Sequence, residues 1–216
     1  MKQLKAVIFD MDGVIVDSEP RHERAFMEVV RQLGYADRLA LRFSDYIGRT
    51  DDDLWRDFIA LHQPTQTLAE LMALKGALMI QLIRREQTLF AGVTELIGKL
   101  APRYALALAS GSDRPVVEAV LELDNLKQFF SVVVSSSDVQ RGKPEPDVFL
   151  RTAELLGVAA GDCWVIEDSK PGIAAGLAAG MGVIAIANTH PAEELAHATH
   201  VVSTYEQIER LLLNHG

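Results

Sequence analysis

Short apolar segments recur along the chain, and most of them lack a strict alternation of apolar and polar residues. A strand with one face in water alternates, whereas a parallel strand covered by helices on both faces is apolar throughout. We therefore predict buried parallel strands at six segments: Ala6–Phe9, Tyr104–Ala109, Val132–Ser135, Cys163–Ile166, Val183–Ala187 and Val201–Val202.

Helical patterns separate the later strands. Pro115 is placed to open the first pattern and Gly157 to end the second, because proline suits the first turn of a helix and glycine the position after its last turn. Thr204 and Gln207 have the spacing of a capping box before the third. The predicted helices are Val116–Leu123, Asp147–Leu156 and Ile208–Leu213. This alternation predicts an α/β fold with a doubly wound parallel, Rossmann-like sheet.

The connection between the first two predicted strands is far longer than the others. Asp10 and Tyr104 are 94 positions apart, whereas a crossover between parallel strands needs about a dozen residues or more. The intervening pattern is helical, with Thr50 as an expected N-cap and a capping box at Thr67 and Glu70. Its predicted helices are Glu19–Leu33, Asp51–Leu61 and Leu68–Glu86. We expect an α/β core of residues 1–16 and 88–216, with an inserted all-helical cap of residues 17–87.

The insert leaves the sheet just beyond the carboxyl end of the first predicted strand. Open α/β sheets bind their ligands at the carboxyl ends of the strands, near the point where the strand order reverses. The insert is therefore a candidate lid over a ligand site.

Composition narrows the class of partner. Of 216 residues, 49% are hydrophobic, which is enough for a sizeable core and too many for a disordered chain. The formal net charge of −9 repels phosphodiester backbones and anionic lipid, so we expect no nucleic-acid partner and no membrane partner. A single cysteine excludes a disulfide within the chain. The apolar run at the N-terminus ends at Asp10, too early for a secretory signal or a membrane span. We expect a cytoplasmic monomer.

Polar residues follow the predicted strands where each strand ends. Taken singly, each has an ordinary structural explanation, since an acid or serine after a strand commonly caps a helix and a loop lysine is commonly solvated. The carboxyl ends of parallel strands converge on one edge of the sheet, so the combination favours a site. Its candidate members are Asp10, Asp12, Ser110, Lys143, Glu167 and Asp168.

These residue types suit phosphoryl transfer, which needs a nucleophile, a divalent cation and fixed donors for the phosphoryl oxygens. Asp10 can attack phosphorus and form an aspartyl phosphate. Because a carboxylate repels a phosphate dianion, Mg²⁺ is expected between them, held with the help of Glu167 and Asp168. Asp12, two residues after the nucleophile and crowded by acids, suits a general acid and base.

The remaining candidates would hold the phosphate. Ser110 and the backbone amides of Gly111 and Ser112 lie at the start of a predicted helix, where N–H groups favour phosphate oxygens. Lys143 adds a compact positive charge that offsets the acids. The expected partner is a small-molecule phosphate ester.

Four sequence motifs resemble those of the haloacid dehalogenase superfamily, in its order and spacing across nearly the whole chain. They are Asp10-Met11-Asp12-Gly13-Val14, Ala109-Ser110-Gly111-Ser112, Gly142-Lys143-Pro144-Glu145-Pro146-Asp147 and Val165-Ile166-Glu167-Asp168-Ser169. The resemblance implies a nucleophile on a central strand, and Mg²⁺ held by Asp10, the backbone carbonyl of Asp12 and the acids at 167 and 168, chiefly Asp168.

The insert resembles the helical cap of the subfamily that contains β-phosphoglucomutase and many sugar-phosphate phosphatases. The resemblance implies a relay role for His22, contact between Arg49 and a phosphate, and a substrate role for Lys75. Without it, His22 reads as a polar hinge residue and Lys75 as a helix lysine whose charge reaches solvent. With Gly111, Ser112 and Arg114, these three make up the expected substrate-binding set.

Several activities share this set of residues. We favour a phosphatase for a sugar phosphate or similar metabolite, with a hexose-phosphate mutase as the alternative. Arg114 stands where the mutase has an amide side chain, which favours the phosphatase. A carbon–halogen hydrolase typically lacks a carboxylate at the place of Asp12, and a phosphoreceiver domain has its acidic pair before its acceptor. A non-catalytic metabolite-binding module is the remaining reading.

Overall fold

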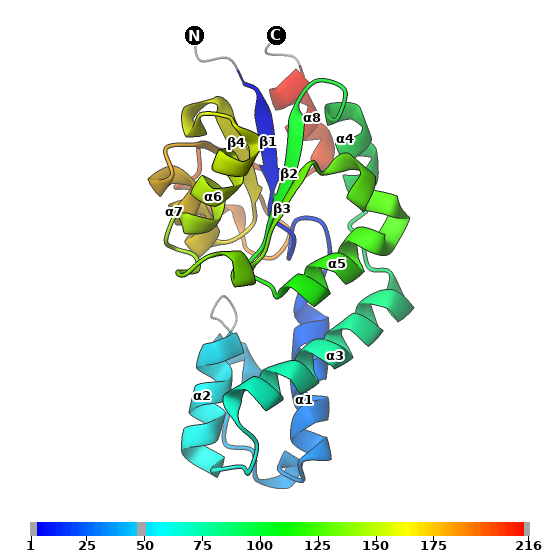
Figure 1. Cartoon of the computed structure of the whole chain (residues 1–216), viewed down its shortest axis with the longest axis vertical. Coiled ribbons are helices and arrows are strands. Elements are labelled where there is room, and N and C mark those ends of the chain that lie inside the picture. Colours follow the sequence, from blue (N-terminus) through cyan, green and yellow to red (C-terminus); the bar gives the residue numbers. More distant parts are fainter. Residues whose placement is uncertain (1–3, 47–50, 214–216) are drawn as a thin grey trace. The chain divides into compact units, whose positions relative to one another are not determined.

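The α/β core contains a six-stranded, fully parallel sheet (Figure 1). The structure is a computed structural model that describes residues 4–46 and 51–213. The strand order is β3-β2-β1-β4-β5-β6. Successive strands are added on one side of β1 as far as β3 and then on its other side from β4, so the strand order reverses between the neighbours β1 and β4. The strands are β1 (Ala6–Phe9), β2 (Ala105–Ala109), β3 (Val132–Val134), β4 (Cys163–Glu167), β5 (Gly182–Ile186) and β6 (His200–Val202). The predicted doubly wound parallel sheet is confirmed.

Helices cover both faces of this sheet. α6 packs on β2 and β3, and α7 on β4 and β5, while α4 and α8 pack against each other on the opposite face (Figure 1). None of the described helices is long and apolar enough to cross a membrane. The core helices are α4 (Val93–Leu100), α5 (Arg114–Glu122), α6 (Asp147–Leu156), α7 (Lys170–Ala178) and α8 (Tyr205–Leu213).

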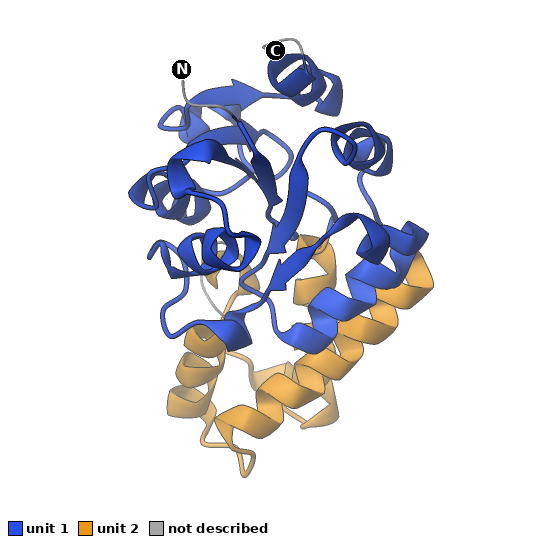
Figure 2. Cartoon of the chain, turned by 45° about the horizontal axis from the view of Figure 1, so that its top comes forward, with its two compact units in different colours: residues 1–17, 88–216 blue, residues 18–87 orange. Residues whose placement is uncertain are grey.

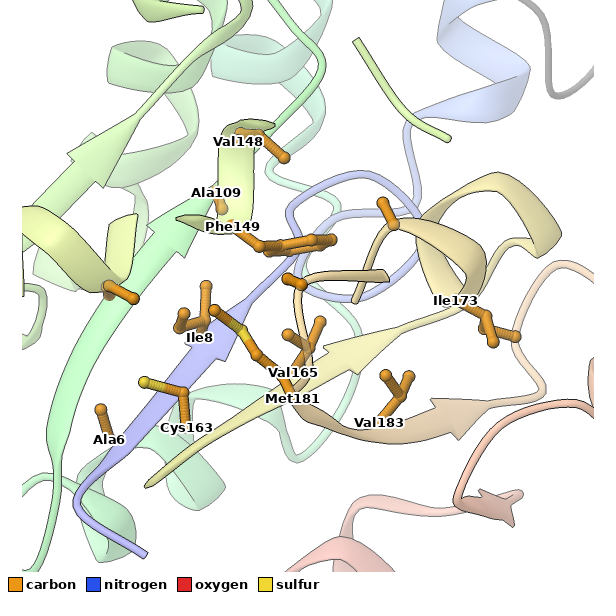
Figure 3. Close-up of a cluster of buried hydrophobic side chains, with 14 of the residues drawn as sticks. Ala6, Ile8, Ala109, Val148, Phe149, Cys163, Val165, Ile173, Met181 and Val183 are labelled. Carbon is orange, nitrogen blue, oxygen red and sulfur yellow. The ribbon is translucent and has the colours of Figure 1, made fainter. Parts of the chain in front are cut away.

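The strands are apolar throughout because both of their faces are buried. On one face, Ile8, Val165 and Phe149 belong to a cluster that joins β1 and β4 to α6 (Figure 3). On the other face, Val7 and Phe9 are also completely buried. Burial of this kind contributes about 1.5–3 kcal/mol for each large side chain, so the sheet is the stable frame on which the polar residues are mounted.

The core helices depart from the sequence expectation at α4, α7 and α8, and α7 was not among the helices predicted. α4 was not predicted: it has only eight residues, and its N-cap, Gly92, offers no capping side chain. At the start of α8, Thr204 Oγ1 accepts from the amide of Gln207 at 3.4 Å, but the Gln207 side chain accepts from Ser203 N. Only half of the expected capping box therefore forms there.

The chain divides into two compact units, Met1–Asp17 with Thr88–Gly216 and Ser18–Gln87 (Figure 2). The second unit contains α1 (Glu19–Gln32), α2 (Asp51–His62) and α3 (Leu68–Glu86), with short 3-10 turns at Ala36–Arg38 and Phe43–Tyr46. Phe26, Trp55 and Phe58 form its aromatic centre. The capping box at Thr67 and Glu70 is confirmed. Thr50, the expected N-cap of α2, lies outside the described residues.

The two segments that connect the core to the second unit lie side by side within the core. Asp17 N donates to Thr88 O at 2.9 Å, and Phe90 N donates to Ile15 O at 3.0 Å. Val16 forms an isolated antiparallel bridge with Leu89. The insert therefore begins and ends at neighbouring points of the core.

Candidate active site

Three buried carboxylates meet at the carboxyl ends of β1 and β4. Asp10 follows β1 directly, Glu167 is the last residue of β4, and Asp168 comes next. Ligand oxygens of the three lie within 4.8 Å of one another, and the exposed fractions of the residues are 5%, 0% and 6%. β1 and β4 flank the point where the strand order reverses, which is where open α/β sheets bind their ligands.

Lys143 joins two of these acids. Its Nζ donates to Asp10 Oδ1 and, at 2.6 Å, to Glu167 Oε1. The ammonium also lies 5.1 Å from the centre of the Phe149 ring. One ammonium therefore lies among three buried carboxyl groups, so the acidic groups outnumber the basic one.

Glu167 is held by groups of its own chain segment. Its Oε2 accepts from Asp168 N at 2.8 Å, and from Ser169 N and Ser169 Oγ at 2.9 Å each. These bonds turn Oε1 toward Lys143. With both oxygens occupied, Glu167 is fixed in position beneath the ammonium.

Burial sets the protonation of this cluster. Loss of hydration raises the pKa of Asp10 to about 8; Lys143 opposes this rise, and Glu167 and Asp12 reinforce it. Burial, with the neighbouring charges of Glu167 and Asp10, also raises the pKa of Asp168 well above its usual range. Ionising both of these neighbouring carboxyl groups is unfavourable in the metal-free site. A divalent cation bound between them would lower that cost, because it attracts both anions. Oxygen donors of this kind suit Mg²⁺.

Asp12 is bound by the serines that follow β2. Ser112 Oγ donates to Asp12 Oδ2 at 2.8 Å, and Ser110 Oγ lies 3.4 Å from the same oxygen. The amide of Ser112 donates to Ser110 Oγ at 3.0 Å, and Gly111 between them is exposed. The structure thus brings Asp12, Ser110 and Ser112 together.

Arg114 lies in a different cluster. Its guanidinium donates to Val133 O at 3.2 Å and pairs with the carboxylate of Asp138. Asp138 in turn accepts from the amide and hydroxyl of Ser135. These contacts join the start of α5 to β3 and to the loop after it, so the observed contacts of Arg114 are with the core around the site.

In the second unit, Lys75 is buried instead of reaching solvent. Only 1% of its surface is exposed, and its ammonium contacts His22 Nδ1 at 2.8 Å and the carboxylate of Asp51. An ammonium can only donate, so His22 Nδ1 must accept and the ring hydrogen must be on Nε2. The sequence did not single out Asp51. Arg49, the third expected cap residue, lies outside the described residues.

Three further polar residues reach the site and were missed from the sequence. Thr189 Oγ1 donates to Asp168 Oδ2, Asn188 Nδ2 donates to Gly13 O at 2.8 Å, and Tyr205 contacts Asn188. Asn188 and Thr189 follow β5, so the argument that selected the other strand ends would have found them. They carry no charge, and an uncharged polar residue after a strand is a weaker sign of a site than an acid or a lysine.

Gly13 shows how tightly this part of the site is built. Its φ is +75°, and a Cβ on it would lie 1.9 Å from Asp168 Oδ2. Only glycine combines this backbone conformation with so close an approach. The turn after Asp12 is therefore in direct contact with the carboxylate of Asp168.

The fold and these contacts define an α/β protein with a buried carboxylate–lysine site at the reversal point of a parallel sheet. The family model of the haloacid dehalogenase-like hydrolases matches residues 4–180, and the chain belongs to this family. The family resemblance inferred from the four motifs is confirmed.

Several named relatives of similar length are phosphatases. Hexitol phosphatase A of Escherichia coli is 34% identical over 94% of this chain and 93% of its own length. Fructose-1-phosphate phosphatase YqaB of the same organism is 32% identical over 82% of this chain and 94% of its own. The crystal structure of β-phosphoglucomutase from Clostridium difficile has the same fold, with a TM-score of 0.82 and 21% identity over 99% of this chain and 96% of its own.

Proposed function

We propose that the protein is a Mg²⁺-dependent phosphomonoesterase for a small phosphorylated metabolite, with sugar and sugar-alcohol phosphates as the first candidates. The observation that supports this best is the pair formed by Asp10 and Lys143 beside two further buried acids, with Asp12 held two residues away. The relatives named for hexitol phosphate and fructose 1-phosphate support the substrate class.

The metal ligands in this proposal are Asp10, Asp168 and the backbone carbonyl of Asp12. Glu167 was expected among them, but both of its oxygens are already bonded, to Lys143 and to the Asp168–Ser169 segment. We therefore assign Glu167 chiefly to the positioning of Lys143. Bound there, Mg²⁺ would supply the positive charge that keeps Asp10 ionised and offsets the charge of the phosphate.

The first step transfers the phosphoryl group to Asp10. Lys143 donates to Oδ1 of Asp10 and holds the carboxylate in place. A carboxylate oxygen of Asp10 attacks phosphorus while the bond between phosphorus and the ester oxygen breaks. Asp12 gives its proton to that leaving oxygen, and an alcohol departs. Ser110, Lys143 and the amides of Gly111 and Ser112 hold the other phosphoryl oxygens as charge develops on them.

The second step returns the enzyme to its starting state. Asp12, now a carboxylate, takes a proton from water while the water oxygen attacks the phosphorus of aspartyl phosphate. The bond to Asp10 breaks, and inorganic phosphate leaves with Asp12 protonated again. In a mutase, a hydroxyl of the substrate takes the place of this water, so the same side chains serve both reactions.

The direct test measures phosphate release from hexitol phosphates, fructose 1-phosphate and β-glucose 1-phosphate, with Mg²⁺ and with a chelator. We expect turnover of at least one ester by the wild type with Mg²⁺, and none by Asp10→Asn. Acid quenching during turnover should trap phosphate on the wild-type chain alone.

Two results would contradict the phosphatase. Conversion of β-glucose 1-phosphate to an isomer without net phosphate release would identify a mutase. Equal inactivity of the wild type and Asp10→Asn on every ester would leave a binding module as the better reading.

For the cap, we propose that Lys75, His22 and Arg49 select the substrate. Replacement of Lys75 by Met keeps the length of the side chain and removes its charge. Because the Asp51 side chain is 38% exposed, water can solvate its carboxylate once the ammonium is gone, so we expect Lys75→Met to melt within a few degrees of the wild type. We expect kcat/KM for the best ester to fall by about tenfold or more, since His22 loses the donor that fixes its ring. Steady-state kinetics and a thermal melt decide this, and unchanged kinetics would count against a substrate role for the cluster.

A further inference from the structure

The turn that follows Asp12 has two backbone carbonyls bonded by side chains from distant parts of the core. Within the turn, the amides of Ile15 and Val16 donate to Met11 O at 2.8 and 3.1 Å, and Gly13 N donates to Val16 O at 2.9 Å. The carbonyls of Gly13 and Val14 are also buried with their residues. Buried carbonyls need partners, so whatever binds these two oxygens fixes the orientation of the turn.

The partners are Asn188, after β5, and Tyr205, at the start of α8. Asn188 Nδ2 donates to Gly13 O at 2.8 Å and to Tyr205 Oη at 2.9 Å. Tyr205 Oη then donates to Val14 O at 2.7 Å. The amide uses both of its hydrogens and the phenol both accepts and donates, so the chain of bonds can run in one direction only.

Tyr205 is built into the core where the cap is attached. It is buried, and its ring lies 3.7 Å from the place of a Cβ on Gly92, next to the second connecting segment. Burial raises the pKa of the Tyr205 phenol, which therefore remains a donor at neutral pH. The residue thus bonds to the chain before the insert and lies near the chain after it.

Orientation of this turn decides where Asp12 points. Gly13 follows Asp12 directly, so rotation of its peptide would move the Asp12 carboxyl. We propose that Asn188 and Tyr205 are positioning residues that hold the turn so that Asp12 meets the leaving oxygen. This inference rests on the function proposed above. A misplacement of about 1 Å in such a group can slow a reaction by about a hundredfold.

Tyr205→Phe removes only the hydroxyl and tests the proposal. Asp12 protonates the leaving oxygen, so its misplacement should matter for an alkyl phosphate and much less for p-nitrophenyl phosphate, whose phenolate leaves without a proton. We expect kcat/KM for the best sugar phosphate to fall by about tenfold, and that for p-nitrophenyl phosphate by less than about threefold. Amide hydrogen exchange at Val14–Val16 should become faster, a readout that needs no substrate.

Tyr104→Phe is the matched control. The Tyr104 hydroxyl also donates to a backbone carbonyl, that of Leu212 in α8, away from the turn. The two variants should therefore lose similar melting temperature, while Tyr104→Phe keeps the kinetics and the turn exchange of the wild type. Asn188→Ala, a second route to the same turn, should show the ester-selective loss of Tyr205→Phe.

The outcomes separate this inference from the function beneath it. An active wild type whose Tyr205→Phe variant matches Tyr104→Phe, or loses activity equally on both esters, overturns the positioning role alone. A wild type that hydrolyses neither ester overturns the proposed function, and the positioning role with it.

Discussion

Asp10→Asn is expected to stabilise the metal-free protein at pH 8 while it ends turnover. Burial raises the pKa of Asp10 from 3.8 to about 8, so between these values the folded chain keeps a proton that the unfolded chain has lost. Stability therefore falls as pH rises through this window. Asparagine has no proton to lose and escapes this penalty, which amounts to a few kcal/mol at pH 8.

Urea unfolding with a chelator at pH 5 and pH 8 measures this effect. The unfolding free energy of Asp10→Asn should exceed that of the wild type by more at pH 8 than at pH 5, and Mg²⁺ should narrow the gap. Asp37→Asn, at an exposed position in the cap, removes one charge without a burial effect and should follow the wild type. Parallel pH trends for Asp10→Asn and the wild type would show that Asp10 is not held in a protonated state.

Gly172→Ala is expected to disrupt the site by displacing Glu167. A Cβ on Gly172 would lie 1.7 Å from Glu167 Oε1 and 1.9 Å from its Cδ. Glu167 must then leave its place. The ammonium of Lys143 loses one of its two carboxylate partners, and the amides of Asp168 and Ser169 lose their acceptor. We expect a loss of about 3–5 kcal/mol in unfolding free energy and a fall in kcat of at least about a hundredfold.

Gly98→Ala is the control for this change. Gly98 also lies in a helix of the core, α4, but nothing lies within 4 Å of the place of its Cβ. Alanine in an open helical position should raise stability by about 0.5–1 kcal/mol and leave kinetics unchanged. Similar stability of the two variants by chemical denaturation would mean that Glu167 can move aside at little cost.

The strands could be predicted because a parallel sheet buried on both faces leaves an unbroken apolar signature, as in Ala6–Phe9. The acids at strand ends could be predicted because topology alone brings those ends together. α4 escaped prediction, since its glycine cap carries no side-chain signal. Tyr205 escaped for another reason: it meets Asn188 across the loop and strand that separate β5 from α8, and no local pattern encodes such a contact.

Side-chain direction was the least predictable property. Arg114 follows Ser112 closely in sequence, yet its guanidinium turns to Val133 and Asp138. Lys75 lies on a helix whose pattern suggests a charge in solvent, yet it is buried with Asp51 and His22. Both outcomes depend on partners that only the folded chain supplies.

The pairing of Asp17 with Thr88 has a consequence for how proteins of this kind diversify. The two ends of the insert are joined by a backbone hydrogen bond between Asp17 and Thr88. Replacement of the insert by another segment therefore leaves the spacing and register of the sheet unchanged. The entropy of closing such an excursion grows only slowly with its length. A different insert can therefore replace this one at the junction of Asp17 and Thr88. The substrate preference of the enzyme can then change in evolution while its active-site residues are retained.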